Sequence, residues 1–233
     1  MKKKFLTTFL SKLTQSSITS IAEESASGTS PPADKAAKVG GNQLVASSAE
    51  VNAFLTKVAS LPKGSGDGRL LFALDATASR QATWDSASHL QAQMFGEAAA
   101  LGGLTVQLCY FRGFGDFFAS DWQSSADSVF GIMQGLRCEA GRTQIGAVLQ
   151  HAMRENSVKP LSCVVYVGDC LEEDIDVLAD LAGKLGLLKV PLFVFQEGRD
   201  AIATAGFKDL CRLSGGAYIV RALKRNVGGR RRR

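Results

Sequence analysis

Oxygen-bearing side chains stand at alternate positions directly after an apolar run of the sequence, at Asp75, Thr77 and Ser79. Alternate residues of an extended chain point to one side, so these three side chains are expected to converge where the chain leaves a strand. Two later positions offer further oxygens: Thr143 in GRTQIGAVL, at the start of an expected helix, and Asp169 in YVGDC, at the end of an expected strand. The sequence thus supplies two carboxylates and three hydroxyls at the ends of separate elements.

A donor set of two carboxylates and three hydroxyls suits a hard divalent cation. Mg²⁺ takes about six oxygen ligands at roughly 2.1 Å and usually keeps several water molecules. Two carboxylates only just balance the charge of the ion, so an incoming carboxylate would be able to complete its coordination. The predicted chemistry is therefore the binding of an acidic group by an electrophilic metal ion.

The same residues also have a purely local interpretation. Asp75 and Ser79 would cap a helix that begins near residue 81, because their oxygens accept hydrogen bonds from the free N–H groups at a helix start. Thr143 would likewise be an N-cap, and Asp169 a turn residue. A shared site accounts for all of these positions together, whereas the local interpretation needs a separate explanation for each.

Hydrophobic patterning predicts the elements that position these residues. Short apolar runs indicate strands at residues 69–75, 104–111, 161–169, 190–196 and 217–221, with 116–120 as a hairpin partner of the second run. Amphipathic segments indicate helices at residues 49–61, 81–101, 124–136, 143–155, 174–186 and 200–213. Continuous apolar strands separated by helices predict an α/β fold, with a doubly wound, mostly parallel, Rossmann-like sheet, helices on both faces and one antiparallel edge strand. Such sheets bind ligands at the carboxyl ends of their strands.

Composition divides the chain into a basic, amphipathic segment 1–14, a flexible linker 15–46, one domain at 47–220 and a basic tail 221–233. Ten of the 27 basic residues lie in the two ends, which leaves 17 basic against 22 acidic residues, a net charge of −5, for residues 5–220. The domain shows no basic stripe with interleaved aromatics, so sequence-specific binding of nucleic acid is not expected. The basic tails are predicted to make at most weak contact with an anionic surface.

The cysteines and the apolar runs bear on the compartment of the protein. Five cysteines form no CxxC pair, and Cys109 and Cys163 lie inside apolar runs, so we expect buried thiols in a reducing compartment and no indication of zinc. No apolar run approaches the roughly 18 residues that span a bilayer, and no clear cleavage site follows the N-terminal lysines. A cytoplasmic protein without a transmembrane segment is expected.

The order of these residues resembles the metal-ion-dependent adhesion site (MIDAS) of von Willebrand factor A (VWA) domains. That pattern is DxSxS, then a Thr, then an Asp. DATAS at residues 75–79 matches the first part with Thr77 in place of the usual serine, and Thr143 and Asp169 match the other parts on the expected elements. The resemblance covers about residues 66–220 and is to the bacterial, intracellular members of the family.

The sequence departs from the family pattern at two further places. Arg80 stands where members of the family often have methionine, and GDC at 168–170 replaces the common TDG. The resemblance implies a metal-dependent adhesion or scaffold module, not an enzyme, in which Mg²⁺ or Mn²⁺ recruits an Asp or Glu of a partner protein. It implies direct ligation by Thr77, Ser79 and Thr143, with Asp75 and Asp169 bound directly or through water.

Two alternatives stay open. In the first, the chain resembles a haloacid-dehalogenase-like, Mg²⁺-dependent phosphatase or phosphotransferase with Asp75 as the nucleophile, VGDCLEED as the late acidic motif and Lys159 neutralising charge. Such enzymes usually carry a second aspartate where this chain has Thr77, and Lys159 is expected at the opposite end of its strand from Asp169. In the second, the domain is a scaffold that binds no metal.

Other residues suggest less. His89 and His151 fall within expected helices without a partner motif, which is typical of surface or packing histidines. Trp84 and Phe114 form a hypothetical recognition rim, because aromatic residues are common at the centres of interfaces.

Overall fold

Residues 68–81 and 104–221 of the 233-residue chain are described by the structure, which is a computed structural model. The expected helices at 49–61 and 81–101 lie outside these residues, apart from the first residue of the second. The predicted segments 1–14 and 15–46 lie outside them too, as does the tail after residue 221.

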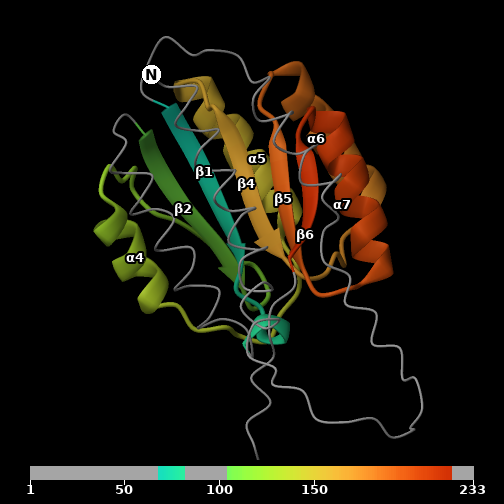
Figure 1. The fold of residues 1–233 in the computed structure, drawn as a ribbon, viewed down its shortest axis with the longest axis horizontal. Helices are drawn as coiled ribbons and strands as arrows, with labels where there is room; N and C mark the ends of the chain where they lie inside the picture. Colours follow the sequence, from blue (N-terminus) through green and yellow to red (C-terminus); the bar gives the residue numbers. More distant parts are fainter. Residues whose placement is uncertain (1–67, 82–103, 222–233) are drawn as a thin grey trace, which may run out of the picture.

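Six strands of the described residues form one sheet in the order β3-β2-β1-β4-β5-β6 (Figure 1). Their bounds are β1 (Gly68–Asp75), β2 (Leu104–Arg112), β3 (Asp116–Ala119), β4 (Cys163–Gly168), β5 (Leu192–Glu197) and β6 (Ala217–Arg221). All neighbours pair in parallel except β3, which runs antiparallel to β2 at the edge of the sheet. The predicted mixed sheet with one antiparallel edge strand is confirmed.

Helices lie on both faces of this sheet. They are α4 (Ala126–Gln134), α5 (Ile145–Val158), α6 (Ile175–Leu187) and α7 (Ala201–Ser214), with a short 3₁₀ helix η1 (Ala78–Arg80) after β1. Helices α5, α6 and α7 pack on one face, and α4 packs on the other. Every residue of β4 and β5 is buried, which is why these strands are continuous apolar runs in the sequence.

The parallel strands bring their carboxyl ends to one edge of the sheet, the lower edge in Figure 1, where η1 lies. Leu74 of β1 pairs with Val167 of β4, and Asp75 pairs with Phe111 of β2. The segments that follow β1, β2 and β4 therefore begin side by side, and the loops after β1 and β4 start next to each other.

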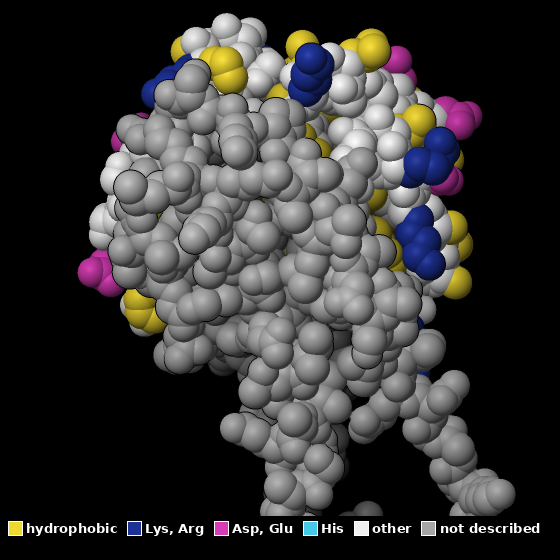
Figure 2. Space-filling view, turned by 45° about the horizontal axis from the view of Figure 1, so that its top comes forward, with side chains coloured by type: hydrophobic (Ala, Val, Ile, Leu, Met, Phe, Trp, Pro, Cys, Tyr) yellow, Lys and Arg dark blue, Asp and Glu magenta, His cyan; other side chains and the backbone are white. Residues whose placement is uncertain are grey.

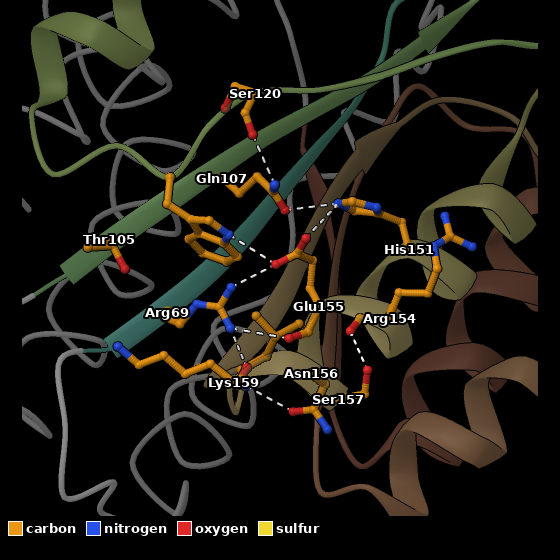
Figure 3. Close-up of polar contacts among 12 residues, drawn as sticks. Arg69, Thr105, Gln107, Ser120, His151, Arg154, Glu155, Asn156, Ser157 and Lys159 are labelled. Atoms are coloured by element: carbon orange, nitrogen blue, oxygen red, sulfur yellow. Dashed lines mark hydrogen bonds and ion pairs between the residues drawn. The ribbon is translucent and has the colours of Figure 1, made fainter.

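A partly buried polar network at the opposite edge ties α5 to the sheet (Figure 3). Arg69 in β1 pairs with Glu155 of α5 at 2.7 Å, and its guanidinium lies 3.8 Å from the centre of the Trp122 ring. The indole N–H of Trp122 donates to the same Glu155 carboxylate at 3.0 Å. The Glu155 carboxylate thus pairs with a cation and also accepts a hydrogen bond from an indole, so its negative charge is well compensated. The network holds the amino end of β1 to the carboxyl end of α5.

His151 belongs to the same network as a packing residue (Figure 3). Burial lowers its pKa, so the imidazole is neutral at pH 7. Gln107 donates through its amide N–H to the carbonyl of Ser120 at 2.9 Å, which leaves the amide oxygen of Gln107 to face His151 Nε2 at 2.9 Å. The Nε2 atom of His151 therefore carries the proton and donates it.

The described helices and the visible surface add two facts. Among the described residues, no helix is both long enough and apolar enough to cross a membrane. On the face shown in Figure 2, the coloured part of the surface carries Lys and Arg side chains set apart from one another among hydrophobic and acidic ones.

Candidate metal centre

The loop after β1 gathers one carboxylate and two hydroxyls. Asp75 is fully buried, and its Oδ1 accepts a hydrogen bond from the backbone N–H of Thr77 at 2.8 Å. The hydroxyl oxygens of Thr77 and Ser79 lie 3.1 Å apart. Thr77 is extended and η1 begins at the next residue, so a tight turn, and not a continued strand, brings the two hydroxyls together.

Asp169 follows β4 and meets Asp75 across the sheet edge. One carboxylate oxygen of each aspartate and the sulfur of Cys170 all lie within 4.8 Å of one another. Asp75 Oδ2 and Asp169 Oδ1 are buried and have no hydrogen-bond partner among the described residues. Buried carboxylate oxygens normally have partners, so this pair is an unsatisfied acceptor site of the kind that a cation fills.

Burial dominates the electrostatics of this pair. Desolvation raises the pKa of Asp75 from 3.8 to about 6, the hydrogen bonds from Thr77 and the charge of Arg80 oppose the rise, and the charge of Asp169 adds to it. The pKa of the Cys170 thiol is also raised, first by burial and then by the charges of Asp169 and Asp75. A cation at this edge would favour the ionised forms of all three groups.

Thr143 is hydrogen-bonded to the loop after β4. Its hydroxyl oxygen accepts a hydrogen bond from the backbone N–H of Glu172 at 3.0 Å, and its own N–H donates to the Glu172 carboxylate at 3.0 Å. The N-cap of α5 is Gln144, so the interpretation of Thr143 as the N-cap is wrong. This reciprocal pair fixes the segment before α5 against the segment that carries Asp169.

Glu173 takes the place of a capping side chain for α5. Its carboxylate accepts hydrogen bonds from the backbone N–H groups of Ile145 and Gly146, the second at 2.9 Å, while Gln144 makes no side-chain cap. Burial raises the pKa of Glu173, and these hydrogen bonds oppose the rise. The neighbouring Asp174 caps the other helix, α6, by accepting a hydrogen bond from the backbone N–H of Asp176.

Replacing Glu173 with alanine is expected to lower the free energy of unfolding by about 2 kcal/mol, because two buried N–H donors of α5 lose their acceptor. Urea denaturation of the full chain measures the change. Asp180→Ala, which removes only an exposed pair with Lys184, is the control and should change stability by about 0.5 kcal/mol or less. An equal loss in the two variants would contradict the capping role.

Arg80 lies buried behind the loop after β1, with 1% of its surface exposed. Its guanidinium pairs with Glu197 at the end of β5, at 2.9 Å, and donates to the backbone carbonyl of Asp75. Burial lowers the pKa of Arg80, but the charges of Glu197 and Asp75 outweigh this effect and raise the pKa above its usual value. The pair ties the Asp75 loop to the carboxyl end of β5.

The hairpin between β2 and β3 borders the same edge. A Cβ atom on Gly141 would lie 1.9 Å from the carbonyl oxygen of Gly113, so the backbones of the two loops approach as only glycine permits. Arg112 pairs with Glu139 at 2.9 Å beside this contact. At the tip, Phe114 is 82% exposed.

The remaining sequence expectations have mixed outcomes. Cys109, Cys163 and Cys211 are buried as expected, but Cys138 and Cys170 are partly exposed, so the prediction of five buried thiols is wrong for these two. Trp84 and His89 lie outside the described residues. Lys159 follows α5, where its backbone carbonyl accepts a hydrogen bond from Arg69, at the opposite edge from Asp169 (Figure 3).

Comparison with known proteins finds likeness in structure alone. No protein-family profile matches the sequence, and no curated protein sequence matches it. The VWA domain of SpRpn10 is similar at 12% identity, with a TM-score of 0.53 over 67% of this chain and 89% of that one. The vWF domain of the type V pili tip protein Mfa5 from Porphyromonas gingivalis is similar at 7% identity, with a TM-score of 0.50 over 69% and 91%.

A third similar structure is proximal thread matrix protein 1 from the mussel byssus, with a zinc-occupied MIDAS motif. It is 14% identical, with a TM-score of 0.52, and the match covers 74% of this chain and 48% of that one. Identities this low establish a shared fold and leave the site and the partner to be argued from this chain's own residues.

Proposed function

This chain has a VWA-like fold, and we propose that it is a metal-dependent protein-binding module and not an enzyme. The observation that carries the proposal is the meeting of Asp75 and Asp169, with a buried, unpartnered oxygen on each, at the carboxyl edge of the sheet. Ligands of doubly wound sheets bind at this edge.

Asp75, Thr77, Ser79, Thr143 and Asp169 are the proposed ligand set for a divalent cation, Mg²⁺ or Mn²⁺. The adjacent hydroxyls of Thr77 and Ser79 and the unpartnered carboxylate oxygens fit a hard ion. When bound, the ion supplies a Lewis-acidic position that accepts a carboxylate oxygen. Glu172 holds Thr143 in place.

The proposed partner is a protein that offers an Asp or Glu to the ion and apolar contact beside it. Phe114 supports the apolar part, because its ring is 82% exposed on the hairpin that follows β2, and Phe111 of β2 pairs with Asp75. An exposed aromatic ring near a metal position that accepts a carboxylate is the composition expected of an interface centre.

Water proton relaxation of the Mn²⁺-loaded full chain tests this recruitment. A peptide with one glutamate should displace metal-bound water and lower the relaxation enhancement, while the same peptide with glutamine should leave it unchanged. Phe114→Ala should weaken the effect of a peptide that also carries an apolar residue and leave Mn²⁺ affinity unchanged. Equal effects of the glutamate and glutamine peptides would contradict carboxylate recruitment.

The phosphatase alternative finds less support. Thr77 leaves the site without a general acid two residues after Asp75, and Lys159 lies at the other edge of the sheet. The metal-free scaffold differs from the proposal in a measurable way, since it predicts no Mn²⁺ binding at all.

Cytoplasmic localisation is part of the proposal and rests on the cysteines. All five are free thiols, as is usual for proteins of a reducing compartment. Weak contact of the basic ends with an anionic surface is likewise proposed, from their charge alone.

A further inference from the structure

Cys170 is the third potential ligand at the Asp75–Asp169 edge. Its sulfur and one oxygen of each aspartate lie within 4.8 Å of one another, and the residue is only partly buried. The sequence alone gives no indication of zinc, because its five cysteines form no CxxC pair. The fold instead joins one cysteine to two carboxylates from different strands.

A second observation indicates that this group is built for a cation. Asp75 is fully buried, and its Oδ2 has no partner among the described residues. Asp169 Oδ1 is also buried without a partner there. Two carboxylates this close repel each other in a poorly hydrated site. A bound divalent ion would offset the repulsion and give both unpartnered oxygens a ligand contact.

The thiol changes which ion this group favours. Oxygen ligands alone suit Mg²⁺, whereas a thiolate suits Zn²⁺, which binds Cys at about 2.3 Å and Asp at about 2.0–2.2 Å. Tetrahedral geometry at those lengths separates oxygen from sulfur by roughly 3.6 Å and the two oxygens by roughly 3.4 Å, so the three atoms need to approach one another by about 1.4 Å at most. Three protein ligands would leave the fourth position open for a partner.

We propose that Cys170 is a ligand of this site and that the site takes Zn²⁺ in preference to Mg²⁺. On binding, the Cys170 S–H bond breaks, the proton passes to solvent, and a sulfur–zinc bond forms with no change in oxidation state. The inference rests on the metal site of the proposed function, keeps Asp75 and Asp169 as ligands, and replaces Mg²⁺ or Mn²⁺ with Zn²⁺ as the preferred ion.

Cobalt titration of the full chain tests it, because Co²⁺ takes zinc sites and a thiolate ligand gives it a charge-transfer absorption in the near ultraviolet. The wild type should show this band. Cys170→Ser and Cys170→Ala should both lose it and bind Zn²⁺ on the order of tenfold or more weakly, while the Mn²⁺ affinity of Cys170→Ser stays within about twofold. Cys138→Ser, which changes the other partly exposed cysteine, should keep the band.

The outcomes separate this inference from the proposed function. A Co²⁺ complex without the band, or one whose band survives both Cys170 substitutions, overturns the inference, and the proposed function then stands if Mn²⁺ binds and the glutamate peptide displaces its water. A Cys170-dependent band together with failure of the peptide test supports the inference and overturns carboxylate recruitment. Failure of the folded wild type to bind any of these ions overturns both.

Discussion

Replacement of Arg80 with methionine is expected to lower the free energy of unfolding by about 3–5 kcal/mol. Arg80 and Glu197 are both buried, 1% and 3% exposed, and form an ion pair at 2.9 Å. Methionine has a similar shape, so the main consequence is a carboxylate left in the interior without its cation. Urea or guanidinium denaturation of the full chain measures the loss.

The double variant Arg80→Met with Glu197→Met is the control. It removes both charges, so most of the lost stability should return, because a well-packed apolar pair often replaces a buried ion pair without loss. A single variant that loses less than about 1 kcal/mol, or a double variant that is no better than the single one, would contradict the burial of this pair.

Replacement of Asp75 with asparagine is expected to stabilise the metal-free protein at neutral pH. The pKa of Asp75 is raised by burial to about 6 in the folded protein, against 3.8 for an unperturbed aspartate. Between these values the folded protein keeps this proton and the unfolded chain releases it, so stability falls as the pH rises from about 4 to about 6 and stays lower above. The shift corresponds to about 3 kcal/mol at pH 7.

The side chain of the Asp75→Asn variant cannot ionise, so this variant should lack the fall. Denaturation with a chelator present, at several pH values between about 4 and 7.5, should show the stability of wild type relative to Asp75→Asn decreasing across that interval. Saturating Mn²⁺ should restore the lost stability of the wild type and leave the stability of Asp75→Asn unchanged. Parallel pH profiles of the two proteins would contradict a desolvated Asp75, and Asp180→Asn serves as an exposed control.

The sequence predicted the elements well because their signals are local. The apolar run expected at 190–196 became β5 at Leu192–Glu197, and the helix expected at 200–213 became α7 at Ala201–Ser214, which ends at Gly215 in the left-handed conformation. The expected helix at 124–136 is shorter, since α4 ends at Gln134 before Gly135. Each of these boundaries is decided by residues within a few positions.

The supports of the site were not predictable in the same way. Arg80 and Glu197 are 117 residues apart, and Glu173 caps a helix that begins 28 residues earlier. No spacing in the sequence marks such pairs, because they depend on which strands become neighbours in the sheet. The sequence does not mark Cys170 as a ligand for the same reason, since Asp75, which lies near it in the fold, comes from another strand.

The Asp75 and Asp169 assignments come from a motif, and the structure adds the contact between them. The sequence proposes Thr143 as a further ligand, but it does not indicate the two hydrogen bonds that join Thr143 to Glu172. Motif order therefore suggests a candidate site, while the hydrogen bonds around it and the role of Arg80 depend on the fold.

The measurement that tests the central claim most directly is a Mn²⁺ titration of the full chain, followed by the electron paramagnetic resonance signal of the free ion. Wild type should bind a single Mn²⁺, and Asp75→Asn and Asp169→Asn should bind none, with folding confirmed by circular dichroism. Asp174→Asn, which changes a neighbouring acid but keeps a capping side chain, should bind as wild type does. A wild type that binds no Mn²⁺, or two site variants that bind it unchanged, would contradict a metal site at this edge of the sheet.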